Sequence, residues 1–320
     1  MMEGLFPWLL NVWKYWQANL EAERFSKATL LVAPDGLGVE KLIKRFSQVL
    51  MCSNYLSEFC GFCRSCQLIS SGNHPDFHLV SPVAKGKVIT VEQIRACSNF
   101  AYASSHLSSL RLVVVKPAEL MTESAANALL KTLEKSSLSC IFLLVASSRN
   151  LLLPTLVSRC QKWSLSLPED AVIFTWLKEQ TRKYIPDCAI CLNSNAPLNT
   201  LSFIEGDGWK NYLLIEGKLL EVIKHDTGTF LELSTLLSRE SDKYLSWLWY
   251  LFSDAQKIHF GLSYTIPGAL ELSTLLSYEQ LYLQFCKLTL LKEQLRLHST
   301  LNSELLIIDW LIDLSSDISQ

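Results

Sequence analysis

The chain has 320 residues, of which 49% are hydrophobic and 19% are charged, and its net charge is −2. This length exceeds what one small core needs, so we expect two or three globular domains. The charge balance argues against a strongly basic nucleic-acid-binding surface spread over the whole chain, although a local basic patch remains compatible with it.

No segment is typical of a membrane span or an export signal. The best apolar candidate, residues 244–252, is shorter than the roughly 20 residues that cross a bilayer. The N-terminus lacks a basic region followed by an apolar core, so we expect a cytoplasmic protein without a signal peptide. In such a chain, four cysteines between positions 52 and 66 favour a metal site over disulfides.

A glycine loop follows the first predicted strand, at residues 29–33, and leads into a helix that ends near residue 50. This is the layout of a P-loop, where backbone amides hold phosphates, a lysine reaches the outer phosphates and a hydroxyl residue binds magnesium. The pattern G-x-x-x-x-G-K-S/T fails at Ala33, Val39 and Glu40, while Gly36 and Gly38 remain in the loop.

The altered loop is also electrostatically unsuited to phosphates, because Asp35 and Glu40 add carboxylates. One like-charge pair at 4 Å costs about 4 kcal/mol at an effective dielectric constant near 20. We therefore predict a P-loop scaffold that does not bind ATP productively. Lys41 is a poor substitute for the missing lysine, because it comes two positions later, on another face of the helix.

Four cysteines with the spacing C-x7-C-x2-C-x2-C predict a structural metal site. Their thiolates can close a tetrahedral zinc site without an open position for water, and His74 is a reserve fourth ligand. The alternative is chance clustering of core cysteines. A second pair, Cys188 and Cys191, has no further ligands nearby, so we expect no metal there. The candidate zinc ligands are Cys52, Cys60, Cys63 and Cys66.

The central stretch, residues 122–160, combines a helix, a buried strand and a loop. Thr122 is a predicted N-cap, and apolar residues with helical spacing follow it. Residues 140–146 form an apolar run that is typical of a strand covered on both faces. Pro154 then opens a turn, and we expect a loop to carry Ser158-Arg159-Cys160 to the surface.

This stretch resembles bacterial clamp-loader subunits of the AAA+ class, on the basis of residues 126–134 (ANALLKTLE) and the later Ser-Arg-Cys triplet. The resemblance implies that Arg159 is an arginine finger, which contacts ATP on a neighbouring gamma/tau subunit, while Ser158 and Cys160 shape its loop. A planar, always-charged guanidinium suits the charge that develops on a transferred phosphoryl group. The simpler interpretation is a solvated surface arginine.

Two other segments support the resemblance and refine the site. AAA+ ATPases carry Walker B acids after the strand that we predict at residues 111–115, but Lys116 and Pro117 stand there in this chain. Residues 72–76 match a segment that follows the zinc module in the delta-prime and gamma families, where cysteines are the ligands. The resemblance therefore implies an all-cysteine zinc site and the loss of both Walker motifs.

The implied fold is an α/β AAA+ domain with a parallel sheet and zinc module, then an all-α lid and an all-α collar. We expect the core at residues 1–167 with the zinc module at 52–66, the lid at 168–214 and the collar at 215–320. Leu305, Ile308, Leu311 and Ile312 are expected to form one apolar stripe in the collar, which packs within the domain or between subunits.

The best family match is the delta-prime family of bacterial DNA polymerase III. It implies an ATPase-inactive subunit of the polymerase holoenzyme, in a hetero-oligomer with gamma/tau and delta subunits that loads the sliding clamp on primed DNA. Zinc would be structural, and ATP would bind only to the neighbouring subunit. The alternatives are an active gamma/tau-type ATPase, a zinc-dependent DNA-binding module, and a purely structural ring subunit.

Overall fold

A computed structural model describes residues 4–54, 58–84, 86–108, 110–134, 139–224, 229–297 and 301–318. The chain forms two compact units, Met1–Pro168 and Glu169–Gln320. The first unit ends within one residue of the α/β core expected from the sequence. The further division of the second unit into a lid and a collar stays a prediction.

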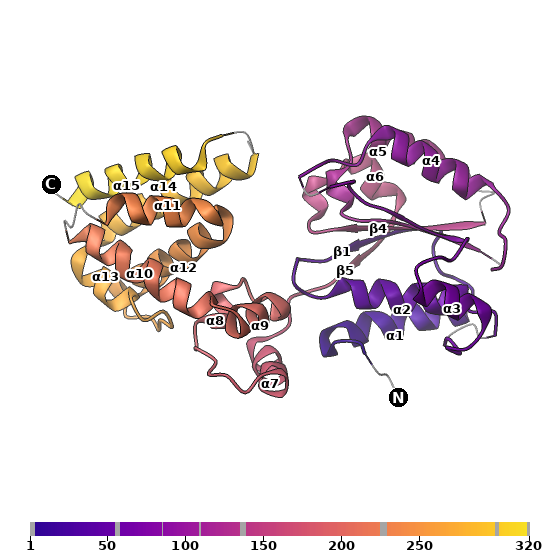
Figure 1. The fold of residues 1–320 in the computed structure, drawn as a ribbon, viewed down its shortest axis with the longest axis horizontal. Helices are drawn as coiled ribbons and strands as arrows, with labels where there is room; N and C mark the ends of the chain where they lie inside the picture. Colours follow the sequence, from indigo (N-terminus) through magenta and orange to yellow (C-terminus); the bar gives the residue numbers. More distant parts are fainter. Residues whose placement is uncertain are drawn as a thin grey trace. The chain divides into compact units, whose positions relative to one another are not determined.

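The first unit is built on a five-stranded parallel sheet in the order β2-β3-β4-β1-β5. Its strands are β1 (Ala28–Val32), β2 (Phe77–Val80), β3 (Arg111–Val115), β4 (Cys140–Ala146) and β5 (Gln161–Ser164). Figure 1 shows α1, α2 and α3 on one face of this sheet and α4, α5 and α6 on the other. The expected α/β fold is confirmed.

Burial on both faces explains the composition of the central strands. Every residue of β3 and β4 is buried, and both strands are nearly continuous runs of apolar residues. A parallel sheet covered by helices on both sides requires this pattern, whereas a sheet with one solvated face would alternate apolar and polar residues. The central position of β4 follows from pairing with β3 on one side and β1 on the other.

Side-chain caps fix the starts of two helices in this unit. The hydroxyl of Thr122 accepts a hydrogen bond from the amide of Ala125 at 3.2 Å, as predicted for an N-cap. Thr90 and Gln93 form a reciprocal capping box at the start of α4. The helices are η1 (Pro7–Leu9), α1 (Leu10–Glu21), α2 (Val39–Met51), α3 (Arg64–Ser70), α4 (Val91–Tyr102), η2 (Ala118–Leu120), α5 (Glu123–Leu133), η3 (Arg149–Leu151) and α6 (Pro154–Arg159).

The second unit is helical throughout the residues that the structure describes. α12 packs against α13 and α14, and α15 packs against α11 and α14. Among the described helices, none has both the length and the apolar character needed to cross a bilayer. The helices are α7 (Asp170–Gln180), α8 (Ala189–Leu192), α9 (Pro197–Glu205), α10 (Gly208–Ile223), α11 (Phe230–Arg239), α12 (Ser241–His259), α13 (Ala269–Leu275), α14 (Tyr278–Leu297) and α15 (Ser303–Ile318).

The apolar stripe expected on the last helix packs only in part within this chain. Leu311 is fully buried, but Leu305 and Ile312 are 63% and 52% exposed. The packed face of α15 instead contains Ile307, Trp310, Leu311 and Leu314. Because α15 is apolar on more than one side, spacing alone did not identify the side that faces the helices α11 and α14.

Candidate functional site

The glycine loop between β1 and α2 keeps the backbone of a P-loop. Gly36 and Gly38 have φ angles of 79° and 69°, a left-handed conformation that favours glycine. Gly38 is the N-cap of α2, and its carbonyl accepts from the amide of Lys41 at 3.1 Å. The loop therefore turns directly into the helix N-terminus, which is the scaffold that phosphate binding uses.

The space inside this loop is small. A cavity of about 50 Å³ lies between residues 33–40, residues 116–119 and residues 145–147. Sites for small molecules usually enclose about 300–1,000 Å³. Four residues that replace the Walker pattern line this cavity: Val39, Glu40, Lys116 and Pro117.

An ion pair between Lys116 and Glu40 bridges the two degenerate Walker motifs. Partial burial acts to raise the pKa of the Glu40 carboxyl, but the hydrogen bond and the charge of Lys116, with a backbone amide, hold this pKa below its usual value. The sequence treated these two residues as separate departures from the Walker motifs, and the structure shows that they contact each other. Glu119, from the same segment as Lys116, accepts hydrogen bonds from the amide and hydroxyl of Ser147, at 2.9 and 2.5 Å.

Lys41 does not enter this cavity. Its ammonium group lies 3.8 Å from the centroid of the Phe6 ring, on a different face of α2 from the Glu40 carboxylate that pairs with Lys116. The geometry agrees with the expectation that Lys41 is a poor substitute for the Walker lysine.

Arg159 lies at the last residue of the short helix α6, so the loop that we expected there is wrong. Pro154 occupies the first turn of this helix, where its missing amide costs nothing. The guanidinium pairs with Glu134 at 2.6 Å, and the two side chains are 44% and 50% exposed. Since α5 ends at Leu133, this partner lies at the C-terminal end of the neighbouring helix.

The two residues beside Arg159 are structural in this chain. The hydroxyl of Ser158 donates to the carbonyl of Thr155 at 2.9 Å, within the same helix. Cys160 is buried, and this burial raises the pKa of its thiol to about 11, although Lys162 acts in the opposite direction. A neutral, buried thiol is a poor nucleophile, so Cys160 contributes packing.

Cys52, Cys60, Cys63 and Cys66, which we call the cysteine cluster, come together at the end of α2 and the start of α3. All four sulfur atoms lie within 4.8 Å of one another, and the sulfurs of Cys60 and Cys66 are 3.9 Å apart. Four zinc–sulfur bonds of about 2.3 Å in a tetrahedron place the sulfurs about 3.8 Å apart. The donor set therefore fits a tetrahedral metal ion such as zinc.

The electrostatics of the cysteine cluster also suit a cation. Partial burial opposes ionisation of Cys63, but hydrogen bonds from the amides of Cys66 and Ser53 outweigh it and lower the pKa of this thiol to about 6. Burial and the neighbouring sulfurs raise the pKa of Cys66 to about 12. A bound metal ion would remove the mutual repulsion of the thiolates and let all four ionise.

His74, the reserve metal ligand, belongs to a different arrangement. Its Nδ1 atom accepts from the amide of Asp76 at 3.1 Å, and its Nε2 atom lies 3.5 Å from the hydroxyl of Ser108. The carboxylate of Asp76 accepts from the amides of His106, Leu107 and Ser108 at 2.7–2.9 Å. We call this arrangement the His–Asp clasp.

The His–Asp clasp joins the cysteine cluster to the sheet. Ser108 also donates to the carbonyl of Met51 at 3.4 Å, one residue before Cys52, and Arg111 at the start of β3 lies 3.5 Å from Asp76. Sequence reasoning matched residues 72–76 only to a family segment and missed this role. The only signal in the sequence was the run His74-Pro75-Asp76 between the cysteines and a predicted strand.

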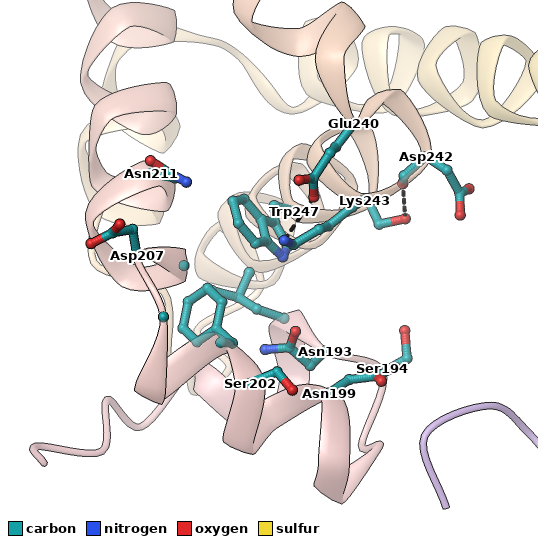
Figure 2. A pocket seen from close by; sticks show the side chains of 15 residues that line it. Asn193, Ser194, Asn199, Ser202, Asp207, Asn211, Glu240, Asp242, Lys243 and Trp247 are labelled. Atoms are coloured by element: carbon teal, nitrogen blue, oxygen red, sulfur yellow. Dashed lines mark hydrogen bonds and ion pairs between the residues drawn. The ribbon is translucent and has the colours of Figure 1, made fainter.

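A further cavity lies in the second unit and was not predicted. It encloses about 590 Å³ between α8, α9, α10 and α12. Figure 2 shows Asp207 and Asn211 on one side, with Glu240, Lys243 and Trp247 on another. Glu240 and Lys243 form an ion pair at 2.8 Å, which leaves the cavity polar at its mouth and apolar at Trp247.

Comparisons with known proteins match both units. The family model described as "DNA polymerase III, delta subunit" matches residues 9–169, and the model of its C-terminal region matches residues 207–316. Together these two models span most of both structural units.

Individual relatives agree with the family models. The "DNA polymerase III subunit delta'" of Escherichia coli is 31% identical over 316 residues, which is 96% of this chain and 94% of that one. The protein of the same name from Yersinia pestis is 33% identical over 80% of this chain and 77% of its own. The one from Haemophilus influenzae is 37% identical over 64% of this chain and 63% of its own. The chain therefore belongs to the DNA polymerase III delta' subunit family.

Proposed function

We propose that this chain is an ATPase-inactive subunit of the DNA polymerase III clamp loader, in a cytoplasmic complex with gamma/tau and delta subunits. The complex would place the sliding clamp on primed DNA, and this chain would reach clamp and DNA through it. Membership of the delta' family supports this role, and the closed P-loop supports the absence of ATP hydrolysis. In the same proposal, residues 168–214 act as a lid and residues 215–320 as a collar.

The observation that carries the proposal is the ion pair between Lys116 and Glu40. In an active site of this class, the Walker A lysine and hydroxyl face the phosphates and the Walker B acid holds magnesium. Here a lysine stands in place of the Walker B acid and a glutamate in place of the Walker A hydroxyl, and the two pair beside a cavity of about 50 Å³ with side chains that are 27% and 71% exposed. Neither the lysine that reaches phosphates nor the carboxylate that holds magnesium remains available.

Arg159 serves in this proposal as a finger toward ATP on a neighbouring gamma/tau subunit. Its guanidinium is half exposed and already paired with a carboxylate, that of Glu134. An exposed pair of this kind is worth only about 0–1 kcal/mol, so a phosphate can displace Glu134 at little cost. The pair would hold Arg159 in place until the neighbouring subunit presents its nucleotide.

The metal of the cysteine cluster is zinc in this proposal, and its role is structural. Four thiolates fill a tetrahedral shell and leave no position for a reactive water. The ion would fix residues 52–66 at the C-terminal end of α2, whereas the P-loop precedes the N-terminal end of this helix.

ATP turnover by the reconstituted complex, with clamp and primed DNA, tests the finger. We compare the wild type with Arg159→Ala and Arg159→Lys, and with Arg24→Ala as an exposed control in the same unit. Both Arg159 variants should lower turnover in an intact ring. The effect should be smaller than the ~10³–10⁵ of GTPase fingers, because one interface among several changes.

Unchanged ATP turnover in both Arg159 variants, with the ring intact, would refute the arginine-finger role and favour a purely structural subunit. A drop with Arg24→Ala equal to that with Arg159→Ala would show that general charge loss, and not the finger, governs turnover.

A further inference from the structure

A basic surface on α2 lacks counter-charges among the residues that the structure describes. Lys41, Lys44 and Arg45 follow one another at positions i, i+3 and i+4, which places them on one face of the helix. Among the described residues, none of the three forms an ion pair with a carboxylate. We call this surface the α2 basic face.

The α2 basic face lines a cavity of about 330 Å³, whose described lining contains no acidic residue. Two further residues line this cavity and enter the argument below. They are Gln48, one turn after Lys44, and Phe59, from the segment of the cysteine cluster. The volume lies within the range of sites that hold small ligands or parts of larger ones. It is also several times the volume inside the degenerate P-loop.

The cations are held in place by aromatic rings and not by counter-charges. Lys41 lies 3.8 Å from the centroid of the Phe6 ring, and the guanidinium carbon of Arg45 lies 4.7 Å from that of Phe59. The Nε atom of Arg45 is buried and has no hydrogen-bond acceptor. A buried donor without a partner is costly, and like charges three and four residues apart destabilise a helix. An anion in the cavity would relieve the repulsion among the three cations.

We propose that the α2 basic face binds the phosphodiester backbone of single-stranded nucleic acid. Donors without charged acceptors extend from Lys41 to Gln48, about 10 Å along the helix at 1.5 Å per residue. This extent suits a repeated polyanion better than one isolated carboxylate. Arg45 stacked on Phe59 adds a planar cation beside an aromatic ring, a combination on which bases stack without regard to sequence.

This site is separate from the proposed action of Arg159, and it accounts for residues that the clamp-loader proposal leaves unused. Lys41 is not a displaced Walker lysine here but part of another site on the same helix. A local site of this kind is compatible with a net charge of −2, because three cations gather on one face while acidic residues lie elsewhere.

The test is binding of a fluorescently labelled oligothymidylate to the full, zinc-loaded chain, measured by anisotropy at several salt concentrations. Three phosphate contacts predict a slope of about −2 for log K against log salt with a single strand. The variant Lys41→Gln/Lys44→Gln should reduce that slope by about 1.4, because it removes two contacts. The control Lys14→Gln/Lys178→Gln removes the same charge from exposed positions and should leave the slope unchanged.

Arg45→Lys keeps the positive charge but removes the planar guanidinium. It should weaken binding and leave the salt slope unchanged. Thermal melting checks that each variant is folded, and the two exposed lysines keep the test valid if an Arg45 variant is unstable. Equal losses in the control, or no binding at 50 mM salt, would overturn the proposal.

Two competitors distinguish the source of the anion. Inorganic pyrophosphate that displaces the oligonucleotide at equal phosphate concentration would overturn the proposal in favour of a small-anion site. Polyglutamate that competes as well as unlabelled oligonucleotide would overturn it in favour of an acidic peptide. Competition by unlabelled oligonucleotide alone would support it.

Discussion

Replacing Asp76 with alanine should destabilise the first unit more than any surface change, because it opens the His–Asp clasp. The Asp76 side chain is 0% exposed, and it accepts hydrogen bonds from three consecutive backbone amides at 2.7–2.9 Å. The Nε atom of Arg111, whose side chain is 3% exposed, lies 3.5 Å away. Alanine would leave the three amides without their acceptor and the buried Arg111 without its counter-charge, although the guanidinium also donates to the carbonyls of Phe100 and Ser104.

The expected cost follows from the buried charge. Removing one partner of a buried ion pair costs about 3–5 kcal/mol. For a domain of 150–250 residues, each kcal/mol lowers the melting temperature by about 2–4 °C, so we expect a decrease of about 6–20 °C. Calorimetry or circular dichroism of the full chain would measure it, with Glu21→Ala as the exposed control in the same unit.

The same clasp predicts a dependence of stability on pH. Burial acts to raise the pKa of the Asp76 carboxyl, but the three amides and the charge of Arg111 outweigh it and hold this pKa below its usual value. Since the folded pKa lies below the unfolded one, the stabilisation is complete above about pH 4 and is lost as the pH falls further. Asp76→Ala should remove that part of the acid dependence. If Asp76→Ala lowers the melting temperature by under 2 °C, or leaves the acid transition unchanged, this account of the clasp is refuted.

Three further predictions concern the metal, Arg159 and the helical unit. A preparation of the chain should hold one zinc ion per chain, and chelation should lower its melting temperature. A preparation that contains no zinc, and whose melting temperature does not change with chelator, would refute the zinc site. Glu134→Gln should change the free energy of unfolding by under about 1 kcal/mol, because its pair with Arg159 is exposed, and a larger loss by urea titration would give the pair a structural role. Gly208→Ala should cost about 1–3 kcal/mol, because a Cβ atom would lie 2.5 Å from the Phe203 ring. Gly217→Ala, in the same helix with open space, should instead stabilise by about 0.5–1 kcal/mol, and equal effects of the two would contradict the packing argument.

The sequence was sufficient for the elements whose signals are local. The strand at Cys140–Ala146 has the predicted bounds, because a buried parallel strand is an uninterrupted apolar run. Thr122 caps its helix as predicted, because capping depends on a hydroxyl and an amide three residues later. The cysteine cluster is equally local, since its sulfurs come from fifteen consecutive residues.

Features that depend on tertiary contacts could not be predicted from the sequence. Glu40 and Lys116 are 76 residues apart, and only the packing of β1 against β4, with β3 beside it, brings their segments together. The partner of Arg159 could not be chosen among exposed acids before α5 and α6 were placed. The buried side of α15 also depends on which neighbouring helices cover it, so spacing alone did not show that Leu305 and Ile312 are exposed in this chain.

Direct measurement of Mg-ATP binding to the isolated chain, by titration calorimetry, tests the central claim that this P-loop is closed. An active gamma/tau-type subunit in the same buffer is the positive control. The account predicts no heat of binding from this chain at concentrations that saturate the control. Saturable binding that Gly38→Ala abolishes would contradict the account and restore the reading of an active ATPase.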